Sequence, residues 1–194
     1  LTSITMPDCL TDIGQIAFAG CIGLTSINIP NSVTNIGIGA FLACSGLTSI
    51  TIPNSITCIA DGVFCGCTGL KSITIPESVK SIGSEAFSEC TELRNITIGN
   101  SVTHIGAEAF YGCEQLKEII LPDGLTSIGN NAFNNCTALE SIIIPSSVTN
   151  VESFGCCNNL KLLVNLSNVK ILSEGKPSDA KIIEIPNGYI EGDY

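Results

Sequence analysis

Cysteine is the residue type with the widest chemical scope in this chain, with eleven thiols among 194 residues. Thiols can form disulfides, hold zinc or act as nucleophiles. Seven of them each lie three residues after a phenylalanine: Cys21, Cys44, Cys67, Cys90, Cys113, Cys136 and Cys157. The first six are spaced by 23 residues, which matches no zinc signature. One small side chain per unit beside a phenylalanine is typical of a core, so we interpret these seven as buried free thiols.

The other four cysteines, Cys9, Cys58, Cys65 and Cys156, occupy variable positions. The sequence places them in turns and at a second strand edge. In an oxidising compartment two of them could pair, whereas in a reducing one all four stay free. Free thiols and a single disulfide both remain open here.

Acid–base chemistry has few candidates. The only histidine, His104, replaces an Asn or Ser at an outward position, and acidic residues such as Glu85 and Glu108 also fall at outward positions. General acid–base catalysis needs a positioned partner, and no nucleophile, base and orienting group recur together. The sequence therefore predicts a protein that is not an enzyme, with no catalytic, metal or cofactor site.

Charge and hydropathy exclude further classes. The formal net charge is −10, which disfavours nucleic acid and anionic membranes as partners because both require clustered Lys and Arg. No run of 18 apolar residues occurs, so no membrane span is predicted. Leu1 begins the chain in phase with the pattern described next, so we expect a signal peptide, a cap or further repeats upstream.

The whole chain is organised by an internal repeat. Leucine recurs every 23 residues at Leu1, Leu24, Leu47, Leu70, Leu93, Leu116 and Leu139. Phenylalanine keeps the same step from Phe18 to Phe133, and Phe154 lies in a shortened last copy. The unit is L-x-x-I-x-I-P-x-S-V-x-x-I-G-x-x-A-F-x-x-C-x-x. A fixed period of this length predicts a solenoid in which each copy packs only on its neighbours.

Each unit predicts a coil with three sides. Alternation over its first six positions predicts a strand with one buried face, ended by proline in most copies. A second apolar pair such as Val33 and Ile36 predicts a short extra strand, and A-F-x-x-C fits one helical turn. We therefore expect an α/β repeat solenoid: a right-handed coil of about seven repeats with a parallel sheet and short helical turns on the opposite side.

The repeat sets the expected boundaries. We assign residues 1–159 to the array and 160–194 to a closing segment that leads to a further region. In that segment Ile183, Ile185 and Pro186 repeat the I-x-I-P strand ending, which predicts a last strand near 182–186.

The unit L-T-S-I-T-I-P-N-S-V-T-N-I-G-x-x-A-F-x-x-C resembles the BspA-like, or Treponema-type, leucine-rich repeat over about residues 1 to 160. The resemblance implies an extracellular or cell-surface protein, of host-associated bacteria or some protozoan parasites, used in adhesion and carrying no catalytic residues. The expected partner is another protein or a glycan, and the expected state is a monomer. The alternative is a passive spacer that presents another domain.

Specificity must lie where the copies differ, on the outward face of the first strand. That face is uncharged in the first three copies and gains charged and apolar residues later. The candidate binding residues are Lys71, Arg94, Thr97, Lys117, Ile120, Glu140 and Ile143. Ile120 and Ile143 form an apolar interface centre, or else reflect strand propensity or cover by the closing segment. Ice binding by the threonine rows is disfavoured, since Asn28 interrupts them and they end after Thr97.

Overall fold

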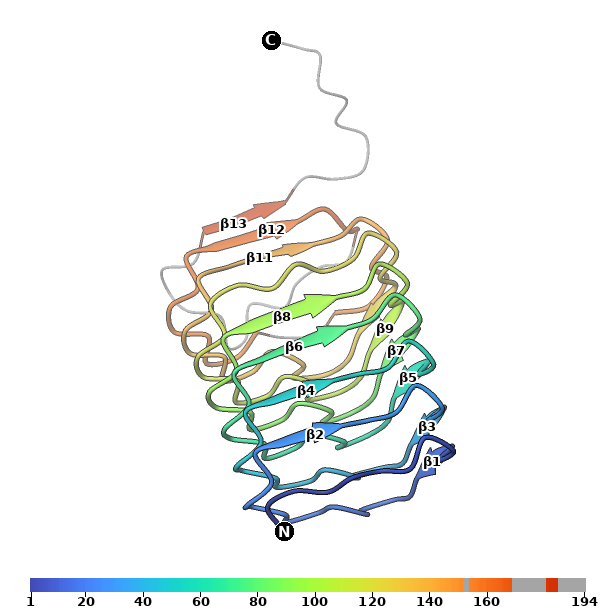
Figure 1. Cartoon of the computed structure of the whole chain (residues 1–194). Coiled ribbons are helices and arrows are strands. Elements are labelled where there is room, and N and C mark those ends of the chain that lie inside the picture. The colour runs from blue at the N-terminus through green and yellow to red at the C-terminus, as the bar shows by residue number, and fades with distance from the viewer. Residues whose placement is uncertain (152–153, 169–180, 185–194) are drawn as a thin grey trace.

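The computed structural model describes residues 1–151, 154–168 and 181–184, and the chain in these ranges winds into stacked coils (Figure 1). All strand pairs are parallel, and each strand pairs with its counterpart one coil away. The result is a β-solenoid of about seven turns, which confirms the predicted parallel-sheet solenoid. Each coil has three walls, which we name the sheet wall, the narrow wall and the turn wall.

The sheet wall carries the longest strands, at the front of Figure 1. They are β2 (Ser26–Asn28), β4 (Ser49–Thr51), β6 (Ser72–Ile75), β8 (Asn95–Ile98), β11 (Ser141–Ile144), β12 (Leu162–Asn165) and β13 (Lys181–Glu184). These strands are shorter than the six positions predicted, and the first copy has none in this wall. Its opening residue, Leu1, has no preceding coil in the structure and is 61% exposed.

The narrow wall confirms the second short strand of each unit. Its strands are β1 (Asp12–Ile13), β3 (Asn35–Ile36), β5 (Cys58–Ile59), β7 (Ser81–Ile82), β9 (His104–Ile105) and β10 (Ser127–Ile128). Each places one isoleucine in the core and one polar or cysteine side chain outside. The period-2 alternation of a half-buried strand is therefore kept even in two residues.

The turn wall corrects the sequence prediction, because the described residues contain no helix. Two positions in nearly every unit have φ between 51° and 70°; in one coil these are Glu85 and Glu89. A right-handed helix cannot continue through such left-handed residues. Alternate amides instead donate to the next coil, as Phe87 N does to Ala109 O (2.8 Å). The amides between them donate within their own turn, as Ser88 N does to Glu85 O (3.1 Å). A third ladder between coils thus replaces the expected helical turn.

The core is a continuous column inside the three walls. Phenylalanine rings of successive coils stack with centroids 5.4–5.9 Å apart, from Phe18 to Phe154. The interior leucines of the repeat, such as Leu47 and Leu93, are fully buried. Since a buried aliphatic or aromatic side chain contributes about 1.5–3 kcal/mol, each coil is held chiefly by its neighbours.

The last strand starts one residue earlier than its sequence pattern suggests. β13 covers Lys181–Glu184, whereas residues 185 and 186 of the predicted strand lie outside the described residues. Ile182 aligns with the buried Leu163, and Ile183 aligns with Val164. Ile183 therefore takes an outward place in the sheet, not the inward place that the I-x-I-P ending indicates, because a one-residue shift exchanges the two faces of a strand.

Candidate binding surface

The outward side of the sheet wall divides into two areas with different chemistry. The hydroxyl face consists of Ser49, Thr51, Ser72, Thr74, Asn95 and Thr97 on β4, β6 and β8. The ionic face consists of Arg94, Lys117, Glu118, Ile120, Glu140 and Ile143. Both areas consist of exposed side chains at the outward positions of the unit.

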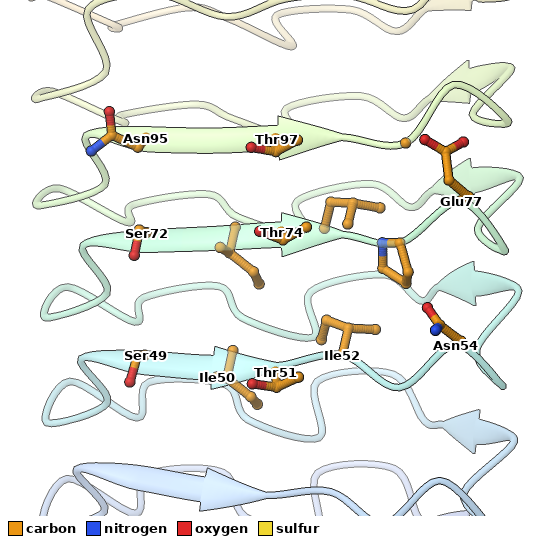
Figure 2. A pocket seen from close by; sticks show the side chains of 14 residues that line it. Ser49, Ile50, Thr51, Ile52, Asn54, Ser72, Thr74, Glu77, Asn95 and Thr97 are labelled. Carbon is orange, nitrogen blue, oxygen red and sulfur yellow. The ribbon is translucent and has the colours of Figure 1, made fainter.

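Two columns of polar side chains make up the hydroxyl face (Figure 2). Ser49, Ser72 and Asn95 form one column and Thr51, Thr74 and Thr97 the next, with Asn54 and Glu77 beyond the strand ends. A hollow of about 540 Å³ lies among them. It coincides with an incomplete ladder, because Ser49 and Ser72 are the only residues of β4 and β6 in paired register.

The sheet wall is interrupted next to the ionic face. Residues 117–121 form no strand, and no backbone hydrogen bond or pairing joins them to residues 94–98. On their other side they keep one isolated bridge, from Glu118 to Ser141. Ile96, which faces inward beside the gap, is only half-buried, whereas Ile73 in the preceding strand is 4% exposed.

The interruption is confined to this wall. In the narrow wall Ile128 still pairs with Ile105, and in the turn wall Phe110 N still donates to Ala132 O at 2.9 Å. Inside, Ile119 and Leu121 remain buried. The coil therefore stays in the stack while its outer strand separates from β8.

An ionic hollow of about 590 Å³ opens at the interruption. Its lining is Arg94, Asn95, Gln115, Lys117, Glu118, Glu140 and Ser141. Arg94 pairs with Glu92 at 3.0 Å and Glu140 with Lys161 at 3.5 Å, both in exposed pairs that contribute little to stability. Lys117 and Glu118 have no ion-pair partner among the described residues, so both charges are available to a ligand.

A column of apolar side chains runs beside this hollow. Ile120 is 83% exposed and Ile143, at the same position of the next coil, is 54% exposed. Ile143 aligns with Val164 and Val164 with Ile183, both half-buried. Sequence reasoning missed Val164 and Ile183, since the closing segment lacks the repeat that numbers its positions. The available signal was Leu160: counted from it as the first position of a unit, Val164 takes the fifth, outward position.

The seven residues predicted from the sequence are all exposed, but they do not form one site. Arg94, Lys117 and Glu140 line the ionic hollow, and Ile120 and Ile143 follow three residues after Lys117 and Glu140 in the same coils. Thr97 instead lines the hydroxyl hollow, and Lys71 lines neither. The ionic face thus keeps five of the seven and gains Glu118, which the prediction left out.

The cysteine ladder has a role that its spacing did not reveal. Each buried ladder thiol donates to the carbonyl oxygen of the phenylalanine one coil back, as Cys90 Sγ does to Phe64 O at 3.2 Å. The same bond recurs at Cys44, Cys67, Cys113, Cys136 and Cys157. Burial raises the pKa of the Cys67 thiol to about 12 and that of Cys90 well above its usual value. These protonated thiols are poor nucleophiles.

The remaining chemical candidates lie apart from one another. All eleven cysteines are free thiols, with Cys9, Cys58 and Cys156 exposed and Cys65 half-buried. His104 Nδ1 lies 2.7 Å from the hydroxyl of Thr103, its neighbour in sequence. Among the described residues no group of three or more His, Cys, Asp or Glu side chains could hold a metal ion, and no helix is long and apolar enough to cross a membrane.

Comparison with known proteins adds the following. A family model described as the BspA type leucine rich repeat region (6 copies) matches this chain over residues 1–104 and again over residues 80–186. A solved leucine-rich repeat protein of T. pallidum is 28% identical, with a TM-score of 0.58, over 90% of this chain and 67% of the other. A solved leucine rich cell surface protein of Faecalibacterium prausnitzii is 25% identical, with a TM-score of 0.57, over 96% of this chain and 68% of the other. No curated protein matches the chain.

Proposed function

Because this chain belongs to the BspA-type leucine-rich repeat family, we propose that it is the non-catalytic binding module of a secreted or cell-surface bacterial protein. Its ionic face binds another protein in adhesion, and the module itself is a monomer. In this proposal residues 1–159 are the array and residues 160–194 the closing segment. The cell-surface description of the similar F. prausnitzii protein supports this location.

One observation carries the proposal. In the described sheet wall from β2 to β13, all pairing between neighbouring coils is lost at one place only, between β8 and residues 117–121. The most exposed apolar side chain of this wall, Ile120, lies at that place. Binding sites between proteins combine an apolar centre with a polar rim. Here Ile120 and Ile143 provide the centre, and Lys117, Glu118 and Glu140 the rim. The backbone of residues 119–121, which lacks a ladder on the side of β8, adds donors and acceptors for a partner.

The test is binding of the labelled protein to immobilised extracellular matrix proteins and to intact eukaryotic cells. Ile120→Asp combined with Ile143→Asp places two charges at the apolar centre, and we expect it to lower affinity about a hundredfold, since central contacts dominate binding energy. Both side chains are exposed, so the fold is retained. Circular dichroism and the melting temperature verify that retention.

A matched control exists on the hydroxyl face. Thr51→Asp with Thr74→Asp introduces the same two charges at the same position of two other coils, and both threonines are exposed. Affinity should then change by no more than about threefold. Equal losses from the two double variants would show that the ionic face is not the binding site.

A second candidate rests on the hydroxyl hollow. Serine, threonine and asparagine side chains there present donors and acceptors without any charge inside the strands, which suits the hydroxyls of a glycan. A glycan array probed with the protein and with Thr74→Val distinguishes the two sites. Loss of a glycan signal in Thr74→Val, with protein binding unchanged, would assign the glycan to this hollow.

The alternative function is a spacer that only presents another domain. A spacer needs no binding residues on its walls, so both double variants above would bind with the same affinity as the unmodified chain. Failure of the unmodified chain to bind any of the matrix proteins, cells or glycans would favour the spacer.

A further inference from the structure

The turn wall changes character along the solenoid, independently of the sheet wall. Its outward positions are apolar in the first two coils, at Ile16, Ile38 and Leu42. They are acidic in the next coils, at Asp61, Glu85, Glu89 and Glu108, and carry amides in the sixth, at Asn130, Asn131 and Asn134. The repeat alone does not require this gradient, because all these side chains point away from the core.

A hollow of about 300 Å³ lies where the apolar and acidic parts meet. Ile16, Ile38 and Leu42 form its apolar side, with exposed fractions of 57%, 50% and 37%. Asp61 and Glu85 lie on its other side, and the half-buried Cys65 completes that side. An apolar depression with charged residues on one border is the form of a small interaction site.

Two glycines make the hollow possible. Gly39 and Gly62 hold the left-handed position (φ +60°) that Glu85 and Glu108 hold in later coils. A Cβ at Gly62 would meet only the Cβ of Cys65, at 4.0 Å, so open space lies above it. The floor is therefore backbone, and neighbouring side chains form the border.

The acidic border has no cation of its own. Neither Asp61 nor Glu85 forms an ion pair among the described residues, and residues 1–70 contain no Lys or Arg. One oxygen of Asp61 accepts a hydrogen bond from Ser84 N at 2.8 Å, which fixes the carboxylate at the border. Burial first, and then the nearby Glu85 and Glu89 carboxylates, raise the pKa of the Cys65 thiol.

We propose that this turn-wall hollow is a second interaction site, distinct from the ionic face, which binds an extended basic segment of a partner protein through one or two aliphatic side chains. The aliphatic side chains insert between Ile16, Ile38 and Leu42, and Lys or Arg side chains beside them contact Asp61 and Glu85. Charge complementarity selects a basic partner over an acidic or neutral one.

The test uses a short peptide that alternates leucine with lysine, and fluorescence anisotropy to measure its affinity for the whole chain. The peptide with glutamate in place of lysine should not bind. Ile38→Ser with Leu42→Ser should raise the Kd about tenfold, and so should Asp61→Asn with Glu85→Gln. Affinity should fall as salt is added.

General attraction to a chain with net charge −10 is the competing explanation. Asp123→Asn with Glu114→Gln removes the same two charges from exposed positions outside all three hollows and should change the Kd by less than about twofold. The peptide should also slow alkylation of Cys65, located by mass spectrometry, without slowing that of Cys58 or Cys156. Equal losses in both charge variants, unprotected Cys65, or no measurable binding would overturn the proposal.

Discussion

The hydroxyl hollow and the ionic hollow have nearly the same size, about 540 and 590 Å³, and lie in the same wall of the solenoid. They differ in how the wall opens. Beneath the first, β4 and β6 still share one paired register, while at the second no hydrogen bond joins residues 94–98 to 117–121. The difference teaches that in a stack with three ladders, one ladder can open locally while the other two and the core hold the coils together.

The largest effect should come from the ring stack, which crosses the interruption. The ring centroid of Phe110 lies 5.5 Å from that of Phe133 across the gap and 5.4 Å from that of Phe87. Phe110→Ala and Phe87→Ala should each cost about 3–5 kcal/mol. Only Phe110→Ala should split urea unfolding into two transitions, because it weakens coils that have already lost one ladder. Two transitions in Phe87→Ala, or one in both, would contradict this difference.

The next largest effect should come from ionisation of the buried thiols at high pH. The folded-state pKa of Cys67 is about 12 against an ordinary value of 9.0, so the thiol contributes stability that is fully present below pH 9 and is lost as pH rises towards 12. We expect the melting temperature to fall over that window.

Alkylation followed by mass spectrometry extends this test to the interruption. Cys9, Cys58 and Cys156 should react first in the folded protein. Cys113 and Cys136, on the two sides of the gap, should react as slowly as Cys67 and Cys90, since the gap is confined to the sheet wall. Faster reaction of Cys113 and Cys136 would mean that water enters the core there.

A smaller effect is expected in amide hydrogen exchange. Amides of residues 119–121 lack ladder partners on the side of β8, whereas those of residues 73–75 lie in β6, which pairs with β8 over four residues. Exchange at 119–121 should be at least about tenfold faster, as expected for locally unprotected backbone. Similar protection in both segments would indicate that the interrupted strand pairs in solution.

The smallest change concerns one hydroxyl. In four coils a serine after the strand donates to a carbonyl of the preceding coil, as Ser78 does to Ile56 O at 2.6 Å, but the interrupted coil has Gly124 there. A Cβ at Gly124 fits, with its nearest contact 3.8 Å away. Gly124→Ser should therefore stabilise the protein by about 1 kcal/mol, and Ser78→Gly should destabilise it similarly. Thermal unfolding measures both.

Most of the fold was predictable because every copy of the repeat places the same residue types at the same positions. Leucine, isoleucine and phenylalanine at a fixed period must face a common core, and the short narrow-wall strand followed from its apolar pair. The prediction of a helical turn was wrong: A-F-x-x-C has the spacing of one helical turn, but alternate amides of that segment donate to the next coil. Left-handed φ at Glu85 is marked only in other copies, where Gly39, Gly62 and Asn131 hold the same position, so this copy read alone does not reveal it.

The candidate site was predictable only as a list of outward residues. Alternation identified Lys117, Ile120, Glu140 and Ile143 as outward, and the structure gathers them beside one hollow. The separation of Thr97 and Lys71 from that group, and the addition of Val164 and Ile183, depended on strand register, which is a relation between coils.

The sequence by itself thus determined the solenoid, its parallel walls and its buried column, because each follows from spacing within one unit. Tertiary structure alone decided where a ladder opens, which side chains share a hollow, and that each ladder thiol donates to a neighbouring carbonyl. The physical reason is that hydrogen bonding between coils depends on the fit of two copies to each other, and no single copy carries that information.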